Sequence, residues 1–408
     1  MEEEWGSNQF IAEQFQRWYT YNSHTIHAPL EIERREFGFL TFFGKNMYRH
    51  IGLSTENELQ RYIRQNAPAH SYHSSSYYED PTAEMARKGW VGADLVFDLD
   101  SDHFDLPCQR EHDKWICRNC GEKGFGHPPE LCKCGKAQFQ TETWICERCL
   151  QAAKHETQKL LDIIIQDFGV QPGDITTNFS GNRGYHIHVH SDTVKPLEQN
   201  ARREIVDYIM ATGLDAEYQG YSQRNRGSKP TLAEGGWRGR TSRALYDYIS
   251  GAAEDKFKEI SGIKAMHSLN AERSRLLKIL TDKHPSNLVP IIDYKNLQNM
   301  IQKAVKLQAA DIDTVVTTDI HRLIRLPNTL HGKTGWQVQT IPYGDLPDYD
   351  PLRSAIVLRG PHVKLEFREA PIIKIDETIY GPYSWETAEL PLEAAMFYLC
   401  KKGARLAR

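Results

Sequence analysis

The core of the fold is decided by the stretch Val91-Gly-Ala-Asp-Leu-Val-Phe-Asp-Leu-Asp100. Alternate side chains of a β-strand share a face, so Leu95 and every second residue after it are expected to point into an apolar core. Asp98 and Asp100 then lie together on the opposite face. Two carboxylates this close repel each other unless a cation neutralises them, and Mg²⁺ or Mn²⁺ prefers carboxylate oxygens while leaving coordination sites open for phosphates. The strand therefore indicates a divalent-cation site, with an acidic, solvent-facing strand end as the alternative.

A glycine-rich turn occurs later in the chain, in the stretch Ser180-Gly-Asn-Arg-Gly-Tyr-His-Ile-His188. The flanking residues 175–179 and 185–190 have the composition of strands, so the turn is expected to join a hairpin. Two glycines in a tight turn expose backbone N–H groups, which suits an anion, and Arg183 adds a planar guanidinium that matches phosphate oxygens. The two histidines of the stretch share one strand face. The pattern suits a phosphate site, although an ordinary hairpin with a core histidine has the same features.

Basic residues gather between positions 312 and 335, after Asp313 and Asp319. Proline and glycine interrupt this stretch, so loops rather than one long helix are expected. Taken alone, the stretch can equally be a solvated charged face, and Asp319 is expected to form a supporting ion pair with Arg322. The crowded basic residues are Arg322, Arg325, His331 and Lys333.

Seven of the eight cysteines lie between Cys108 and Cys149. Paired C-x-x-C motifs in a chain without a secretory signal indicate a metal site rather than disulfides, with redox or free thiols as the alternative. Tetrahedral zinc takes four such ligands, and a closed shell of four is structural rather than catalytic. The spacing predicts two nested zinc sites, or at least one. The outer set is Cys108, His112, Cys146 and Cys149, and the inner set is Cys117, Cys120, Cys132 and Cys134.

The 408-residue length predicts two or three structural units, or one large domain with insertions. An apolar content of 40% and a net charge of −4 exclude a disordered or repeat-dominated chain, and any nucleic-acid surface must be locally basic. No apolar run approaches the roughly 18–20 residues that cross a bilayer, and the acidic N-terminus lacks the features of a secretory signal, so neither a membrane segment nor secretion is expected. The expected division is a core of 1–107, 150–221 and 311–408, a zinc-binding insertion at 108–149, and a basic loop with a helical subdomain at 222–310.

Together and in this order, these elements resemble the small, catalytic subunit of archaeal and eukaryotic-type DNA primase, most closely its archaeal members. The resemblance covers most of the chain. The outer cysteine–histidine set is similar to the zinc knuckle of the family, whereas the inner cysteines are a departure that expands it. The motifs that carry the resemblance are Arg35–Phe39 with Met47–His50, Asp98-Leu-Asp100, Ser180-Gly-Asn-Arg-Gly-Tyr-His186, Asp313 before the block 322–331, and Asp350-Pro-Leu-Arg353.

The resemblance implies an α/β (α+β) catalytic core with a mixed sheet flanked by helices, an inserted zinc module and a small, mainly helical subdomain. It implies template-directed synthesis of short RNA primers, with DNA as a further product, on single-stranded DNA by two-metal nucleotidyl transfer. Asp98, Asp100 and Asp313 would hold two Mg²⁺ or Mn²⁺ ions. The nucleotide-binding residues implied by the matching motifs are Glu36, Arg49, Ser180, Arg183, His186, Arg325, His331 and Lys333.

The resemblance also implies partners and a setting. The substrates are nucleoside triphosphates and a single-stranded template, and the partner is a large subunit that carries an iron–sulfur domain. This chain has only Cys400 outside the zinc segment, so the large subunit is expected to be a separate chain. Action in the cytoplasm of an archaeal-type cell is expected, or in the nucleus of a eukaryote. The alternatives are a primase-like repair or translesion polymerase that only extends primers, and a catalytically dead zinc-ribbon protein that binds nucleic acid.

Overall fold

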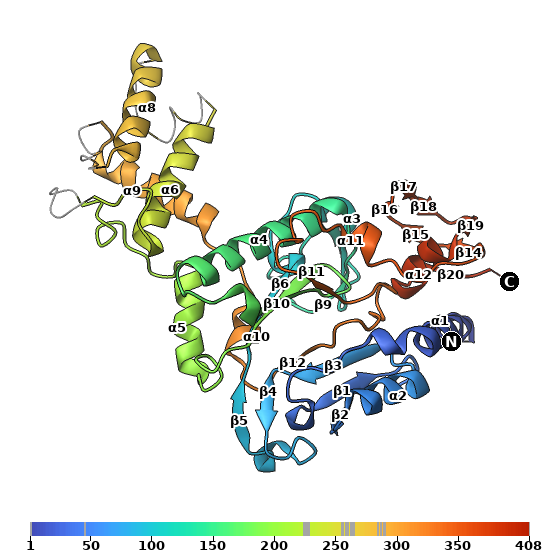
Figure 1. The fold of residues 1–408 in the computed structure, drawn as a ribbon. Coiled ribbons are helices and arrows are strands. Elements are labelled where there is room, and N and C mark those ends of the chain that lie inside the picture. Colours follow the sequence, from blue (N-terminus) through green and yellow to red (C-terminus); the bar gives the residue numbers. More distant parts are fainter. Residues whose placement is uncertain are drawn as a thin grey trace. The chain divides into compact units, whose positions relative to one another are not determined.

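The computed structural model describes residues 2–44, 46–222, 229–253, 257, 261, 266–283, 285, 288 and 291–407. The chain forms two compact units, each described here by itself (Figure 1). The larger unit comprises Met1–His155, Pro172–Arg202 and Ile312–Arg408, and the smaller unit comprises Glu156–Gln171 and Arg203–Asp311. Helices and strands alternate along the chain, and the strands form several sheets. This confirms the predicted mixed α/β class. No helix among these described residues is both long and apolar enough to span a bilayer.

Several helices begin at a residue whose side chain accepts a hydrogen bond from one of the first free backbone N–H groups. At α2, for example, Thr55 accepts from the N–H of Glu58, and Glu58 accepts in return from the N–H of Ser54. The α-helices are α1 (Glu2–Asn22), α2 (Glu56–Asn66), α3 (Gln109–His112), α4 (Glu147–Gln166), α5 (Gln199–Ile209), α6 (Gly236–Gly251), α8 (Met266–Thr281), α9 (Tyr294–Gln308), α10 (Thr314–Thr318), α11 (Pro351–Ser354) and α12 (Leu392–Cys400). Short 3₁₀ turns occupy Ser23–Thr25, Ile32–Arg34, Met85–Arg87, Ser101–His103 and Pro172–Asp174.

Two four-stranded antiparallel sheets form the centre of the larger unit, in the orders β12-β3-β1-β2 and β13-β10-β11-β6. The predicted hairpin is present as β10 and β11, and β11 also pairs with β6. The strands of these sheets are β1 (Phe37–Leu40), β2 (Tyr48–Ile51), β3 (His70–Ser74), β6 (Leu95–Asp100), β10 (Ile175–Phe179), β11 (Gly184–Val189), β12 (Leu323–Arg325) and β13 (Gln339–Ile341).

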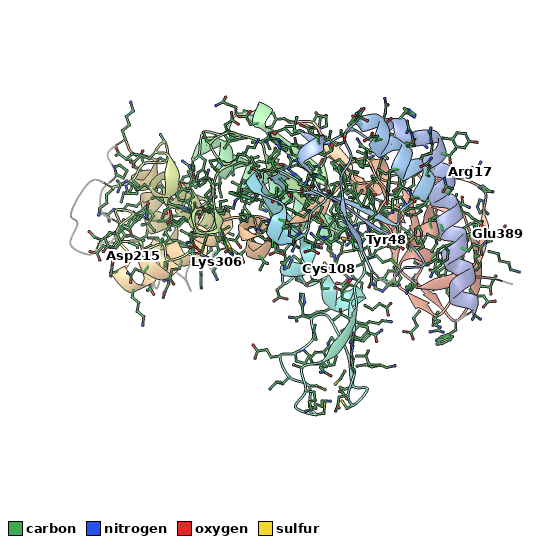
Figure 2. The ribbon with its side chains drawn as sticks, turned by 90° about the horizontal axis from the view of Figure 1, so that it is seen from below. Arg17, Tyr48, Cys108, Asp215, Lys306 and Glu389 are labelled. Carbon is green, nitrogen blue, oxygen red and sulfur yellow. The ribbon has the colours of Figure 1, made fainter. Side chains whose placement is uncertain are left out.

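Smaller sheets complete the larger unit. A three-stranded ribbon of β8-β7-β9 carries the inner cysteines, and a C-terminal sheet has the order β19-β14-β20. The strands are β4 (Ser76–Tyr78), β5 (Trp90–Ala93), β7 (Lys114–Cys117), β8 (Lys123–Phe125), β9 (Phe139–Glu142), β14 (Val363–Phe367), β15 (Glu369–Ala370), β16 (Ile373–Ile375), β17 (Thr378–Tyr380), β18 (Tyr383–Ser384), β19 (Thr387–Leu390) and β20 (Ala404–Leu406). In Figure 2 the ribbon projects away from the sheets, with Cys108 at its base.

The predicted strand 92–100 is divided at Asp94. β5 pairs with β4 before this residue, whereas β6 joins the central sheet after it. The buried Asp94 carboxylate forms an ion pair with Arg35 (Oδ2–Nη2 2.8 Å) and accepts a hydrogen bond from the hydroxyl of Tyr77 (2.6 Å). These contacts hold the Asp94 side chain in the interior at the break between β5 and β6.

The basic segment 222–243 was expected to be a loop, and this is wrong for its second half. Residues 223–228 lie outside the described residues, but α6 begins at Gly236. Arg240 is 1% exposed and binds two carboxylates of the smaller unit, with Nη1 2.7 Å from Asp162 Oδ2 and Nε 2.5 Å from Asp167 Oδ2. Because its charge is already neutralised in the interior, Arg240 serves the packing of this unit rather than a nucleic-acid surface.

Candidate active site and metal clusters

Two chain segments, β6 and the start of α10, bring three carboxylates together at the end of β6. From Phe97 onward the strand has the predicted alternation, since Phe97 and Leu99 are buried while Asp98 and Asp100 are half-buried; the preceding Leu95 and Val96 are both buried. The backbone N–H of Asp313 donates to the carbonyl oxygen of Asp98 at 2.9 Å. Asp313 also begins α10, where its Oδ1 accepts from the next free N–H groups, those of Val315 (2.8 Å) and Val316 (3.2 Å). The capping helix therefore fixes the third carboxylate beside the other two, in a stretch for which strand and loop were expected.

The negative charge of this cluster shifts the pKa of Asp98. Burial, followed by the negative charges of Asp100 and Asp313, raises the pKa of Asp98 to about 7. A cation bound beside this carboxyl group would lower its pKa again and favour the ionised form. Among the described residues, the two cysteine-rich groups have all their ligand atoms within 4.8 Å of one another, and the carboxylates are spread more widely.

The loop 180–184, which we call the glycine loop, is closed by its own serine. Ser180 Oγ accepts from the N–H groups of Asn182 (3.3 Å) and Gly184 (3.2 Å). Gly181 has a φ of +79°, and a Cβ at Gly184 would lie 2.4 Å from the carbonyl oxygen of Leu99. Only glycine fits both positions, because one needs the left-handed region and the other touches the backbone of β6. Through this contact the glycine loop lies directly against Asp100, the register partner of Gly184.

Two buried groups of this region have hydrogen-bonding capacity left over. Arg183 lies 3.6 Å from Asp100 (Nε to Oδ1) and also pairs with Asp102, but its Nε has no hydrogen-bond partner within the described part of the chain. His186 faces Asp98 across the sheet (Nε2 to Oδ1 3.7 Å), and its Nδ1 is likewise unsatisfied among the described residues. Burial, followed by the charge of Arg325, lowers the pKa of His186 to about 3. The ring is therefore neutral at pH 7, and both groups retain hydrogen-bonding capacity that a ligand could use.

A group of basic side chains lies on β12 and in the turn after it. We call this group, Arg325, His331 and Lys333, the basic wall. Arg325 Nη1 donates to His70 Nδ1 (2.5 Å), and its guanidinium lies 4.5 Å from the centre of the Tyr72 ring. His331 packs edge-on against His70 with ring centres 4.9 Å apart, and its Nδ1 accepts from the N–H of Lys333 (3.2 Å). Burial, followed by Arg325, lowers the pKa of His331 well below its usual range. Of the predicted basic residues, Arg325 and His331 are thus held together by His70 and Tyr72.

Sequence reasoning missed these two supporting residues. His70 and Tyr72 are two residues apart on β3, so their side chains share one face of the sheet, in which β12 is the neighbouring strand. The only signal in the sequence is a polar residue and an aromatic residue two positions apart in a short strand. The predicted ion pair of Asp319 with Arg322 is not formed, because Asp319 Oδ1 instead accepts from the N–H of His321 (2.9 Å).

Glu36 and Arg49 form a separate, tightly bonded cluster. Arg49 Nε lies 3.0 Å from Glu36 Oε1, and Lys88 Nζ lies 3.2 Å from Glu36 Oε2. The N–H of His50 donates to the same carboxylate at 3.1 Å. Although burial raises it, the pKa of Glu36 is lowered overall by these donors. Glu36 is therefore saturated with protein partners, and Arg49, which is 38% exposed, is the member of the pair that can reach a ligand.

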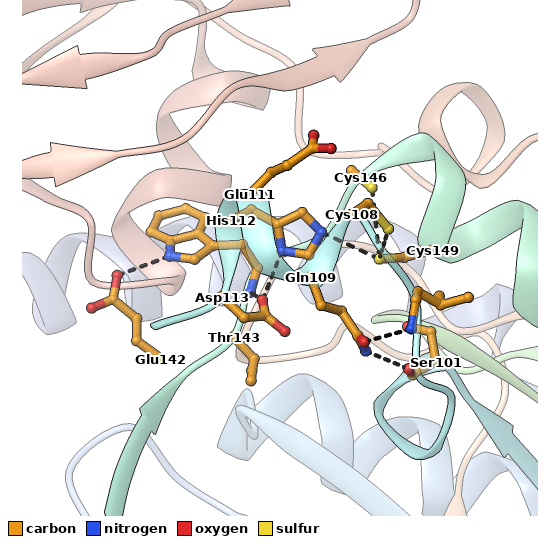
Figure 3. Close-up of polar contacts among 12 residues, drawn as sticks. Ser101, Cys108, Gln109, Glu111, His112, Asp113, Glu142, Thr143, Cys146 and Cys149 are labelled. Carbon is orange, nitrogen blue, oxygen red and sulfur yellow. Dashed lines mark hydrogen bonds and ion pairs between the residues drawn. The ribbon is translucent and has the colours of Figure 1, made fainter. Parts of the chain in front are cut away.

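The outer cysteine–histidine cluster has the dimensions of a tetrahedral metal site (Figure 3). Cys149 Sγ lies 3.6 Å from the sulfurs of Cys108 and Cys146 and 3.4 Å from His112 Nε2. With Zn–S bonds near 2.3 Å, a tetrahedron has S–S edges of about 3.8 Å, so the spacing fits zinc. His112 Nδ1 is 2.7 Å from Asp113 Oδ1, the second partner that orients such a ligand.

The outer cluster is connected to the carboxylate strand. Gln109, on α3 beside Cys108, donates through its side chain to the carbonyl oxygen of Ser101 at 2.9 Å (Figure 3). Ser101 directly follows Asp100, and its N–H donates to the carbonyl oxygen of Arg183 at 3.4 Å. The position of the cluster is therefore tied to the end of β6.

The inner cluster brings together the four cysteines that the spacing grouped. Cys117 Sγ is 3.7 Å from Cys134 Sγ, and Cys120 Sγ is 3.5 Å from Cys132 Sγ. These distances exclude disulfides and fit the same tetrahedral edge. Cys120 and Cys134 are exposed, in contrast to the buried members of the outer cluster. The structure thus assembles both predicted sets of four ligands.

Comparison with known proteins agrees with this arrangement. Residues 130–341, more than half of the chain, match the family model described as DNA primase small subunit. The chain is 31% identical over 402 residues to the DNA primase small subunit PriS of Nitrosopumilus maritimus, covering 98% of each chain. It is 31% identical to the PriS protein of Methanothrix thermoacetophila, covering 97% of this chain and 98% of that one. It is 35% identical to that of Natronomonas pharaonis over 82% of each.

Proposed function

Because the chain belongs to the family of DNA primase small subunits, we propose that it is the catalytic subunit of a DNA primase, a nucleotidyltransferase that makes RNA primers on a DNA template. The observation that carries the proposal is the convergence of Asp98, Asp100 and Asp313 beside the buried Arg183 and His186. An acidic cluster next to unsatisfied cationic and neutral donors is the arrangement that a nucleoside triphosphate and its divalent ions require.

The three carboxylates would hold two divalent ions, Mg²⁺ or Mn²⁺. When bound, such ions lower the pKa of a 3′-hydroxyl nucleophile and stabilise the pyrophosphate that leaves. The raised pKa of Asp98 supports this assignment, because the acidic cluster has charge that only cations can neutralise.

The remaining proposed site residues bind and orient the triphosphate. Arg183 offers a buried guanidinium, and neutral His186 offers a ring nitrogen that can donate to a phosphate oxygen. Arg325, His331 and Lys333 supply the basic wall, and Ser180 shapes the loop. Arg49, held by Glu36, is on β2, the edge strand opposite to the one that carries Arg325. Low water access strengthens each of these contacts relative to the same pair in solvent.

Each cysteine cluster is proposed to hold one structural zinc ion. The tetrahedral spacing of sulfur and nitrogen atoms supports two ions, and the closed sets of four leave no coordination position for catalysis. We also propose that the chain works with a separate large subunit, on single-stranded DNA in the cytoplasm of an archaeal cell. The archaeal relatives named as small subunits support this setting.

A priming assay tests the proposed function. The protein, with Mg²⁺ or Mn²⁺ and labelled nucleotides, is expected to make short products on a single-stranded template without any primer. Ribonucleotides and deoxyribonucleotides are tested in parallel, which also identifies the preferred sugar. Extension of an annealed primer without any unprimed product would instead identify a repair or translesion polymerase. No metal-dependent incorporation at all would leave only a nucleic-acid-binding protein.

Replacing His186 with alanine is expected to raise the KM for nucleotide about tenfold. The loss of one buried hydrogen bond to a charged phosphate costs about 1.5 kcal/mol, which corresponds to that factor. Steady-state kinetics on a primed template measure the change. His362→Ala is the matched control, because His362 is exposed and is expected to leave KM unaltered. An unchanged KM in the His186 variant would remove this residue from the triphosphate site.

A further inference from the structure

Lys401, at the C-terminal end of α12, reaches back to two segments that are distant in sequence. Its Nζ donates to the side-chain Oδ1 of Asn182 at 3.4 Å and to the carbonyl oxygen of Thr143 at 3.2 Å. Asn182 is the central residue of the glycine loop, and Thr143 lies just before the second half of the outer cysteine cluster. One amine thus bridges the candidate phosphate loop and the candidate zinc site.

The surroundings of this amine are unusual for a lysine. Both acceptors are neutral, and no carboxylate oxygen among the described residues forms an ion pair with Nζ within 4.0 Å. Burial, followed by the charges of Arg183 and Lys333, lowers the pKa of Lys401 to about 7, against the smaller opposing effect of Asp100 and Asp113. A cation held among other cations without a neutralising partner is unfavourable, so the site is organised for an anion.

The contact also completes the support of the glycine loop. On one side, Thr334 Oγ1 donates to the carbonyl oxygen of Gly181 at 2.6 Å. On the other side, Lys401 holds Asn182, the next residue. The loop between Ser180 and Gly184 is therefore fixed from two directions by residues that belong to later parts of the chain.

A continuous path runs from the lysine to the outer cluster. Thr143 precedes Trp144, whose backbone N–H donates to Asp113 Oδ1 at 2.8 Å. That same oxygen lies 2.7 Å from Nδ1 of His112. Figure 3 shows Thr143, Asp113 and His112 in this arrangement. The ligand histidine, the backbone before Trp144 and the lysine thus form one chain of polar contacts that ends at the glycine loop.

We propose that Lys401 is a positioning residue of the triphosphate site: it fixes Asn182 and so the glycine loop against the outer metal cluster, and it adds positive charge behind the bound phosphates. This inference rests on the proposed function, since it takes the glycine loop as the triphosphate site. The recognised sequence motifs contain no residue from the C-terminal helix, so the role depends on the three-dimensional contacts alone.

Four variants of the full-length protein test the proposal by steady-state kinetics with nucleotide on a primed template. Lys401→Met, which removes the amine, is expected to raise the nucleotide KM five- to tenfold while kcat changes less than twofold. Lys401→Arg, which keeps a charged donor, is expected to bring KM back to within twofold of the wild type. Lys364→Met, at an exposed lysine of the C-terminal sheet, is the matched control and should leave both constants unchanged. Arg183→Met tests the triphosphate site itself and should raise KM more than tenfold.

The outcomes distinguish the proposed role of Lys401 from the proposed triphosphate site itself. If Arg183→Met raises KM but Lys401→Met does not, the role of Lys401 is refuted while the triphosphate site stands. If neither variant alters KM, the triphosphate site itself is refuted. Circular dichroism and zinc content establish that Lys401→Met is folded, and Lys401→Gln replaces it if it is not. A KM that stays high in Lys401→Arg would also overturn the proposal, because a charged donor would then be insufficient.

Discussion

Asparagine in place of Asp98 is expected to abolish primer synthesis and, at the same time, to make the metal-free protein more stable at pH 8. Activity should fall by at least about 10³-fold, because a neutral amide at this position would weaken the binding of the two proposed divalent cations. The gain in stability follows from the titration of the carboxyl group. Its pKa in the folded protein is raised to about 7 by burial and by two neighbouring carboxylates.

The raised pKa of Asp98 determines at which pH its carboxyl group destabilises the folded protein. An unfolded aspartate has a pKa near 3.9, so between about pH 4 and pH 7 the folded state retains a proton that the unfolded chain has lost. The contribution of the protonated form to stability is therefore complete below about pH 4 and is lost as the pH rises through 7. At pH 8 the charged Asp98 side chain, which is 20% exposed, opposes folding, and the amide relieves about 1–3 kcal/mol.

Chemical denaturation of the metal-free protein at pH 4.5 and pH 8 measures the difference. The variant should exceed the wild type in free energy of unfolding at pH 8, and the gap should narrow at pH 4.5. Asp105→Asn is the control, since Asp105 is an exposed carboxylate of the same acidic stretch and should alter neither activity nor stability. Retention of more than a tenth of the wild-type synthesis rate in Asp98→Asn would contradict the assignment of this residue to the metal site.

The part of the site that could be predicted from sequence is the part in which local spacing decides the geometry. In β6, the period of two places Leu99 inside and Asp98 outside whatever the rest of the chain does. Tight turns bring paired cysteines such as Cys117 and Cys120 to one point, and the nested order then follows from the position of each pair in the ribbon. Mixed α/β architecture and family membership were likewise predictable, because ordered motifs such as the glycine loop carry them.

Features that depend on distant partners could not be predicted in this way. The end of β5 is decided by Asp94 and by Arg35, a residue 59 positions earlier that nothing in the local pattern connects to it. Arg240 resembles a solvent-exposed basic residue until the two carboxylates that bury it are known. The same holds for Lys401, whose contacts join three segments of the larger unit. In each case a long side chain contacts residues that are distant in sequence and are brought close only by the tertiary fold.

Loss of the outer metal cluster is expected to unfold the larger unit, whereas loss of the inner cluster should leave the unit folded. Cys149 is 1% exposed at the start of α4, and Trp144, also 1% exposed, packs between the cluster and the rings of Phe397 and Tyr398 on α12. Structural zinc contributes about 10–16 kcal/mol of apparent binding free energy, which equals or exceeds the whole stability of a typical domain. Cys149→Ser should therefore lower the Tm by at least about 10 °C and abolish primer synthesis.

Cys134→Ser is the matched comparison, because Cys134 is an exposed ligand at the far end of the ribbon. Within the part of the chain that the structure describes, the ribbon strands β7, β8 and β9 pair only with one another, so we expect their local unfolding to leave the central sheet intact. We expect a Tm within about 3 °C of the wild type and retained extension of a primer. Metal analysis should find two zinc ions in the wild type and one in the Cys134 variant. Equal losses of Tm and activity in the two variants would show instead that the clusters act as one unit, and the separation between a supporting outer site and a peripheral inner site would fail.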